Sequence, residues 1–285
     1  MNKGSVYNGS EFVMATLHKK AQKVAPIFLH KLGASVVECV ADTDVLGTFS
    51  GEIDRKNNFL DSARIKCELG LNKTNAYYGL ASEGSFGHHR YIPFFTVNTE
   101  ILYFIDKLRG FHLHMMHVSE KNNYAWSIVR SFLEIENFAR KALFPSHGLI
   151  VRPHVWDDKN IIFKGIQSKH ILEEAFNVSL KYSVDCAVWV ETDMRAHMNP
   201  SRMLVIQELA EKMAQRLSTV CPQCTTPGWG ICRTGKKIKC SWCGEDTQLI
   251  KSDFLGCVTC TYEEEVDRFN KFIGDLSEHC INCNP

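Results

Sequence analysis

Short apolar runs alternate with amphipathic stretches along the first part of the chain. Residues 11–16 and 35–40 are apolar runs of strand length, and the segment between them has helical periodicity and closes at Gly33. A second amphipathic segment, which carries Lys66, leads into the apolar run 77–81. Strands that alternate with helices are typical of an α/β domain. The pattern therefore predicts an α/β fold in the order strand, helix, strand, helix, strand.

The same alternation continues through the middle of the chain. Strand-like patterns cover residues 91–97, 101–105, 111–118, 148–151, 161–163 and 187–190, and helical patterns cover residues 126–143, 170–180 and 200–217. Asn199 and Pro200 form a favoured start for the last helix. We expect one mixed sheet with flanking helices, in a domain of residues 1–217.

The apolar run 77–81 leads into an acid, two glycines and a hydroxyl, in the segment Ser82-Glu83-Gly84-Ser85-Phe86-Gly87. We expect the strand to end here, because ligands in α/β sheets bind at the carboxyl ends of strands. Glu83 is then a metal ligand or a base, with Ser85 and His88 near the substrate. The alternative is a tight glycine turn with a solvated glutamate.

Eight cysteines near the C-terminus form four C-x-x-C pairs. They are Cys221 and Cys224, Cys240 and Cys243, Cys257 and Cys260, and Cys280 and Cys283. A C-x-x-C turn offers two thiolates to one metal, so the spacing predicts two structural zinc ions in a small zinc-ribbon-like domain of residues 218–285. The pairs combine sequentially or in an interleaved way, and the interval between Cys224 and Cys240 favours the sequential arrangement. Cys232 is left as a buried thiol or a substitute ligand.

Composition adds limits rather than a function. The 285 residues are 45% apolar with a net charge of +1, which is ordinary for a soluble protein and gives no overall field toward nucleic acids or membranes. No apolar run reaches membrane-spanning length and no signal peptide is recognisable, so we expect a cytoplasmic protein without membrane attachment. A homo-oligomer is compatible with the sequence. A short basic stretch, residues 233–239, leaves nucleic acid open as a less favoured partner.

A group of hydrogen-bond donors precedes the last helix. Arg195, His197, Ser201 and Arg202 lie around its predicted N-terminus, where anions are favoured. We expect these side chains to face a bound phosphate or base. The alternative is an ordinary helix cap with solvated charges.

Taken whole, the chain resembles an uncharacterised bacterial family that shares its layout from end to end. The resemblance is carried by G-T-F-S-G-E (residues 47–52), A-S-E-G-S-F-G (81–87), H-G-L-I-V-R-P (147–153), D-M-R-A-H-M-N-P-S-R-M (193–203), C-P-Q-C and the closing C-N-P. That family implies no particular activity.

The first 90 residues also resemble the inosine triphosphate pyrophosphatases, which hydrolyse deaminated purine nucleoside triphosphates. The resemblance implies that Thr16, His18 and Lys20 hold phosphates. It further implies that Glu52 and Glu83 bind Mg²⁺ and activate water, that Lys66 lies beside them, and that His197, Ser201 and Arg202 contact the base. The chain differs from that family in having His18 where asparagine is usual and in lacking its late glycine-rich signature.

The resulting hypothesis is a Mg²⁺-dependent phosphoanhydride hydrolase that acts on a nucleotide and carries a structural zinc tail. Lys20, Lys66 and Arg202 would neutralise phosphate charge. Two alternatives remain open at this point. One is a nucleotide- or anion-binding protein without catalysis, and the other is a zinc-ribbon adaptor that binds protein or RNA.

Overall fold

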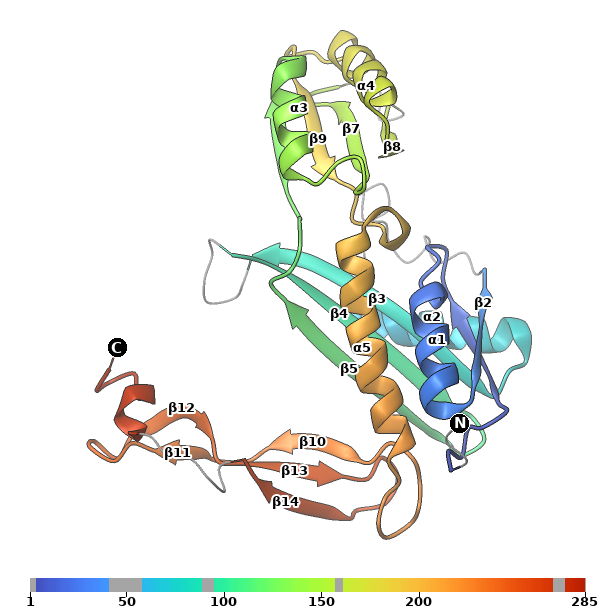
Figure 1. The fold of residues 1–285 in the computed structure, drawn as a ribbon, viewed down its shortest axis with the longest axis vertical. Helices are drawn as coiled ribbons and strands as arrows, with labels where there is room; N and C mark the ends of the chain where they lie inside the picture. Colours follow the sequence, from blue (N-terminus) through green and yellow to red (C-terminus); the bar gives the residue numbers. More distant parts are fainter. Residues whose placement is uncertain (1–3, 41–57, 89–94, 157–160, 269–274, 285) are drawn as a thin grey trace.

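The structure is a computed structural model that describes residues 4–40, 58–88, 95–156, 161–268 and 275–284. It has three parts (Figure 1): a five-stranded sheet with helices on both faces, a smaller lobe with a four-stranded sheet, and a C-terminal arm built of short strands. No helix within the described ranges is both long and apolar enough to cross a membrane.

The larger sheet has the strand order β2-β1-β3-β4-β5. Its strands are β1 (Glu11–Ala15), β2 (Ser35–Cys39), β3 (Tyr78–His88), β4 (Thr96–Asp106) and β5 (Phe111–Ser119). Strand β1 runs parallel to both β2 and β3, whereas β4 runs antiparallel to both β3 and β5. The predicted mixed α/β sheet is therefore confirmed.

Strand β1 is buried on both faces, which explains why its sequence is a continuous apolar run rather than an alternating one. Phe12 and Met14 pack with helices α1 (Ala21–Leu32) and α5 (Pro200–Ser218) on one face. Val13 packs with helix α2 (Phe59–Thr74) on the other. The ring of Phe12 also stacks on Tyr78 and Phe104, with centroids 5.1 and 5.4 Å away.

Two of the predicted helix ends are found as expected. Helix α1 ends at Gly33, which has a φ of +69°, a conformation that glycine adopts without strain. At the start of α5, Asn199 accepts a hydrogen bond from the backbone N–H of Arg202 at 3.0 Å, and Pro200 occupies the first turn. This cap fixes where the Arg202 side chain leaves the helix.

Strand β3 does not end at the glycines. It continues through Gly84 and Gly87 to His88 and pairs with β4 over its whole length. The expected end of the strand at this segment is therefore wrong, and so is the alternative of a tight glycine turn, because Glu83 lies in the middle of a strand. A glycine inside a strand can allow a neighbouring group to lie close to the backbone. The local sequence does not distinguish such a glycine from one in a turn.

Residues 126–192 form the smaller lobe. Its elements are β6 (Trp126–Val129), α3 (Phe132–Lys141), β7 (Leu149–Pro153), β8 (Phe163–Ile166), α4 (Lys169–Lys181) and β9 (Val188–Thr192), with the antiparallel strand order β6-β9-β7-β8. Apolar residues of α3, α4 and the strands form a core of their own. The expectation of one sheet is wrong, because these strands form a second sheet.

The helix expected over residues 126–143 is also corrected. Its first residues pair with β9 as strand β6, and the helix starts only after Ser131, which accepts a hydrogen bond from Glu134 N–H at 3.3 Å. Aromatic and β-branched residues such as Trp126 and Ile128 favour the strand.

The C-terminal arm follows α5. It contains β10 (Gly230–Thr234), β11 (Lys237–Lys239), β12 (Asp246–Ile250), β13 (Ser252–Gly256), β14 (Glu263–Asp267) and the short 3-10 helix η3 (Leu276–His279). The strands form a three-stranded sheet, β10-β13-β14, and a hairpin, β11-β12. The expected domain boundary between residues 217 and 218 falls in the last turn of α5 and stays a prediction.

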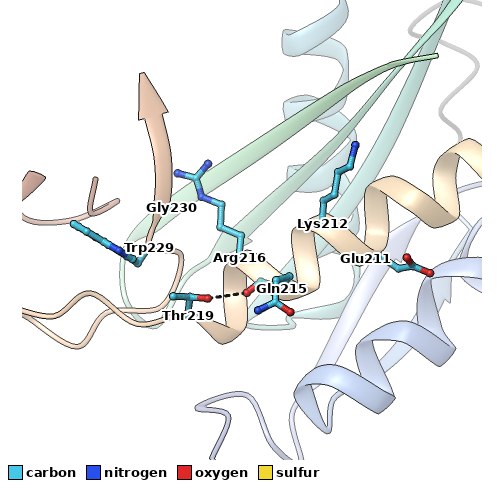
Figure 2. Close-up of a pocket in the computed structure, with 7 residues that line it drawn as sticks. All are labelled: Glu211, Lys212, Gln215, Arg216, Thr219, Trp229 and Gly230. Carbon is cyan, nitrogen blue, oxygen red and sulfur yellow. Dashed lines mark hydrogen bonds between the residues drawn. The ribbon is translucent and has the colours of Figure 1, made fainter. Parts of the chain in front are cut away.

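Arg216 on α5 fixes the start of the arm. Its guanidinium donates to the carbonyl of Gly228 at 3.1 Å and to that of Ile231 at 2.9 Å. Trp229 is buried at the same junction and stacks on Tyr262, with centroids 5.4 Å apart. Residues of α5 and the first arm residues line an open groove of about 440 Å³, and Figure 2 shows these residues. The arm is thus attached to α5 by specific contacts.

Candidate functional site

The eight paired cysteines gather into two groups of four. One group is Cys221, Cys224, Cys257 and Cys260, and the other is Cys240, Cys243, Cys280 and Cys283; within each group the sulfur atoms lie within 4.8 Å of one another. The Sγ atoms of Cys224 and Cys257 are 3.5 Å apart, and those of Cys240 and Cys283 are 3.8 Å apart. Four thiolates at about 2.3 Å from a zinc ion have edges of about 3.8 Å. The two groups therefore fit two zinc ions.

The C-x-x-C turns combine in the interleaved way, so the sequential arrangement favoured by the spacing is wrong. Strands β10 and β13 pair from Gly230 opposite Gly256, which places the turns before β10 and after β13 side by side. The chain between Cys224 and Cys240 includes β10 and β11, and extended strands carry Cys240 away from the first turn. Sheet pairing, rather than the interval along the chain, decides which cysteines meet.

Backbone groups in the C-x-x-C turns support thiolate ligands. The N–H of Trp242 donates to the Cys240 sulfur at 3.4 Å, and the N–H of Thr259 donates to the Cys257 sulfur at 3.3 Å. The turns that begin at Cys221 and Cys240 close on residues with positive φ, Thr225 at 59° and Gly244 at 75°. Four protein ligands leave no open position on a zinc ion, so these sites are structural.

Cys232 belongs to neither group. It is exposed, and its sulfur lies 3.3 Å from the Phe254 carbonyl and 3.4 Å from a Glu263 carboxylate oxygen. The expectation of a buried thiol or a substitute zinc ligand is wrong, because the residue is exposed and its sulfur lies in neither group.

A second candidate site lies at the edge of β3, just beyond the end of β1. The two strands pair only as far as Ala15 opposite Ala81, so from Ser82 onward this edge has no partner among the described strands. Lys20 lies against the edge, and its ammonium donates to the Ser82 carbonyl at 2.7 Å and lies 3.4 Å from the Ser82 hydroxyl. Its side chain is buried, at 5% exposure.

Charged side chains lie on both faces of the sheet around Lys20. On the face covered by α2, Glu83 forms an ion pair with Lys66. On the face covered by α1 and α5, Arg202 pairs with Glu100 at 2.6 Å. We call these five residues, Lys20, Lys66, Glu83, Glu100 and Arg202, the charged cluster. It contains three cationic side chains and two carboxylates.

Burial and neighbouring charges shift the protonation of this cluster. Burial, and then the charge of Arg202, lower the pKa of Lys20 to about 7, although Glu100 and Glu83 act in the opposite direction. Burial raises the pKa of Glu83, but the charges of Lys66 and Lys20 outweigh it and the net shift is downward. At neutral pH Glu83 is therefore a carboxylate, while Lys20 is close to its midpoint.

Arg202 is fully buried and its guanidinium is well satisfied. Besides Glu100 it bonds the Met194 carbonyl at 2.5 Å, and it lies over the Phe86 ring at 5.2 Å. A Cβ on Gly84 would lie 2.2 Å from an Arg202 nitrogen and 2.4 Å from a Glu100 oxygen. Gly84 therefore lets the Arg202 and Glu100 side chains lie close to the backbone of strand β3.

Replacing Gly84 with alanine should lower the free energy of unfolding by roughly 1–3 kcal/mol, because the added methyl group overlaps the buried Arg202 and Glu100 side chains, which would have to move. Gly87→Ala is the matched control, since it lies on the same strand and a Cβ there meets nothing within 4 Å. Urea unfolding of both variants measures the difference. Equal stability of the two variants would contradict this account of Gly84.

Two histidines stack beside Lys20. The rings of His18 and His197 are nearly parallel, with centroids 5.0 Å apart. Burial, and then the charges of Lys20 and His197, lower the pKa of His18 to about 3, so it is neutral at physiological pH. The Thr16 hydroxyl accepts a hydrogen bond from the His18 N–H at 3.1 Å. Thr16 and His197 therefore both contact His18, and Lys20, whose charge acts on His18, reaches the open edge of β3.

Other predicted site residues have different surroundings. Ser201 bonds His147 of the smaller lobe at 2.9 Å, and Arg195 pairs with Asp193 at 2.6 Å. Ser85 and His88 lie farther along β3, and His88 is exposed at its end. Glu52 lies outside the described residues. The distance between Glu52 and Glu83 thus stays a prediction.

Sequence reasoning missed Glu100. This acid lies within strand β4, immediately before its apolar run 101–105 and directly opposite Gly84, and it is fully buried. An acid next to the apolar run 101–105 is the signal that could have found it, because a carboxylate that is buried with such a run needs a partner.

A protein-family model matches most of the chain. This family model is described as "Domain of unknown function (DUF6671)" and matches residues 66–285. The chain belongs to this family. The match covers Lys66, Glu83, Arg202 and all eight zinc-site cysteines, whereas Thr16, His18 and Lys20 precede it.

Neither this match nor a search of curated proteins shows a relationship to the inosine triphosphate pyrophosphatases, and no curated protein matches the chain. The family description carries no activity. Across the described ranges, the groups that could hold a metal ion are the two cysteine groups. Lys66 neutralises the charge of Glu83, and among the described residues no other unpaired carboxylate groups with it. The described residues therefore do not by themselves fit Mg²⁺.

Proposed function

We propose that the protein binds a phosphate-bearing small molecule, a nucleotide first of all, at the open edge of β3 beside Lys20. One observation carries the proposal. Lys20 is buried, and the described residues provide it with no ion pair of its own, only bonds to Ser82. A buried ammonium without a partner is costly, and an anionic ligand would compensate it.

The charge of the cluster supports an anion rather than a cation as ligand. Both carboxylates are already engaged, Glu83 with Lys66 and Glu100 with Arg202. Lys20 is thus the cationic side chain in excess. A phosphate oxygen next to it would raise its pKa again and gain a charge-assisted hydrogen bond.

The neutral histidines extend this site. His18 and His197 present ring nitrogens within a stacked pair beside Lys20, and the Thr16 hydroxyl lies next to them. Uncharged imidazoles bind sugar hydroxyls or bases without adding repulsion to the cations already present. This arrangement favours a nucleotide over inorganic phosphate alone.

Hydrolysis of a phosphoanhydride bond is the second candidate function. It is favoured by the ionised Glu83 and the near-neutral pKa of Lys20, which are properties of a general base and a general acid. It also accords with the resemblance of the N-terminal strand, loop and helix to the inosine triphosphate pyrophosphatases. A magnesium ion would need further oxygen ligands, and Glu52 is our candidate for one of them.

Isothermal titration of the full chain with ATP, inosine triphosphate and inorganic tripolyphosphate tests the proposal. We expect saturable binding of at least one nucleoside triphosphate at one site per chain, in buffer without added Mg²⁺. No binding of any of the three ligands would contradict the proposed site. Release of pyrophosphate or phosphate after adding Mg²⁺ would support hydrolysis, and binding without any release would overturn the hydrolase version alone.

A further inference from the structure

The arm carries a lysine-lined groove on the hairpin between the two cysteine groups. The groove measures about 690 Å³ and is lined by Lys236, Lys237, Ile238, Lys239, Asp246 and Lys251. The backbone N–H of Lys251 donates to the Lys236 carbonyl at 2.8 Å, which holds these two residues next to each other. In Figure 1 the hairpin β11-β12 lies in the outer half of the arm, away from the large sheet.

The charges of the arm are separated by sign. Arg233 and Arg268 are neutralised by Glu263 and Asp253, at 2.7 and 2.6 Å. Of the groove lysines, Lys239 pairs with Asp246 at 3.0 Å, whereas in the described part of the arm Lys236, Lys237 and Lys251 have no ion pair.

Acidic residues of the arm concentrate on another strand. Strand β14 reads Glu-Glu-Glu-Val-Asp and pairs with β13, not with the lysine hairpin. Residues 218–285 contain seven Lys or Arg and nine Asp or Glu. This weakly acidic total charge therefore conceals a local basic groove.

An exposed tryptophan lies beside this groove. Trp242 is 72% exposed and follows Lys239 by three residues, so their Cα atoms are at most about 11 Å apart. Its backbone N–H bonds the Cys240 sulfur, and the metal site therefore fixes its position. At this exposure much of the indole ring is accessible to a partner.

We infer that this groove and Trp242 bind single-stranded nucleic acid, independently of the small-molecule site proposed above. Lysines along a groove follow a row of phosphates, and an aromatic ring next to them stacks on an unpaired base. The bases of a duplex are already stacked and cannot use the ring. An anionic membrane fits less well, because the lysines line a hollow rather than a protruding tip.

The test is fluorescence anisotropy with labelled single-stranded RNA and DNA of about 15 nucleotides, a length that spans one such site. The full chain with both zinc ions should bind at low salt. Lys236→Ala with Lys251→Ala should weaken binding by about tenfold and reduce the salt dependence by about 0.7 per lysine removed. Trp242→Ala should weaken it roughly fivefold to a hundredfold, and Trp242→Phe should recover most of the loss.

Lys121→Ala with Lys141→Ala is the matched control, because both lysines are exposed and lie outside the arm. This control should bind as wild type does, and zinc content should stay at two ions in every variant. The inference is overturned if single strands do not bind, if the control weakens binding as much as the groove variant, or if duplexes or anionic vesicles bind in their place. Unchanged titration of nucleotides by the groove variants separates this site from the one at Lys20.

Discussion

A chain with Cys224→Ser and Cys257→Ser should keep one zinc ion, whereas a chain with Cys224→Ser and Cys243→Ser should keep none. The interleaved groups place Cys224 and Cys257 at one metal site and Cys243 at the other. Each structural zinc contributes on the order of 10 kcal/mol to the folding of its segment. Loss of both ions should therefore unfold the arm, which has few apolar contacts of its own, and leave the two sheets of residues 11–192 folded.

Elemental analysis of the purified chains measures this directly, and limited proteolysis reports whether the arm has opened. Cys232→Ser is the matched control, since this cysteine is outside both groups and should leave two ions bound. The opposite result for the two double variants, none retained in the first and one in the second, would show a sequential pairing and contradict the structure.

Replacing Arg202 with methionine should lower the free energy of unfolding by roughly 3–5 kcal/mol. The substitution leaves Glu100 fully buried without its cation, and an uncompensated buried charge is strongly destabilising. Replacing both residues together, as Arg202→Met with Glu100→Met, should cost less than the sum of the two single changes, because no lone charge then remains.

Urea unfolding followed by circular dichroism measures these changes. Arg64→Met is the control, because Arg64 pairs with Asp61 and Glu68 at the surface and should contribute less than about 1 kcal/mol. Strictly additive effects of the Arg202 and Glu100 substitutions would contradict the direct pairing.

Much of the fold is readable from local patterns. Short-range preferences of the residues determine the helix caps at Gly33 and Asn199 and the apolar runs of β1 and β2. These preferences can be recognised in the sequence directly. The zinc-site residues are equally local, because each C-x-x-C turn is a four-residue unit. What these patterns specify is the elements, not their partners.

The parts that sequence reasoning predicted wrongly depend on contacts between distant residues. Gly84 looks like a turn residue until Arg202, far along the chain, is seen to occupy the space of its missing side chain. In the same way, the zinc pairing follows from strands β10 and β13, and the division into two sheets follows from the pairing of β6 with β9. The position of Glu100 opposite Gly84 also required the register of two strands.

The central claim is an anion site at Lys20. It is tested directly by titrating tripolyphosphate, or a nucleotide that binds the wild-type chain, into the variants Lys20→Met and Lys19→Met. Lys19 is the neighbouring exposed lysine and serves as the control. The Lys20 variant should bind at least about tenfold more weakly, a loss of about 1.4 kcal/mol, and the Lys19 variant should bind as wild type does.

Wild-type affinity should also fall as the pH rises from about 7 to about 9, because Lys20 has a pKa of about 7 and loses its charge over that range. Equal affinity of Lys20→Met and wild type at neutral pH would contradict the proposed site.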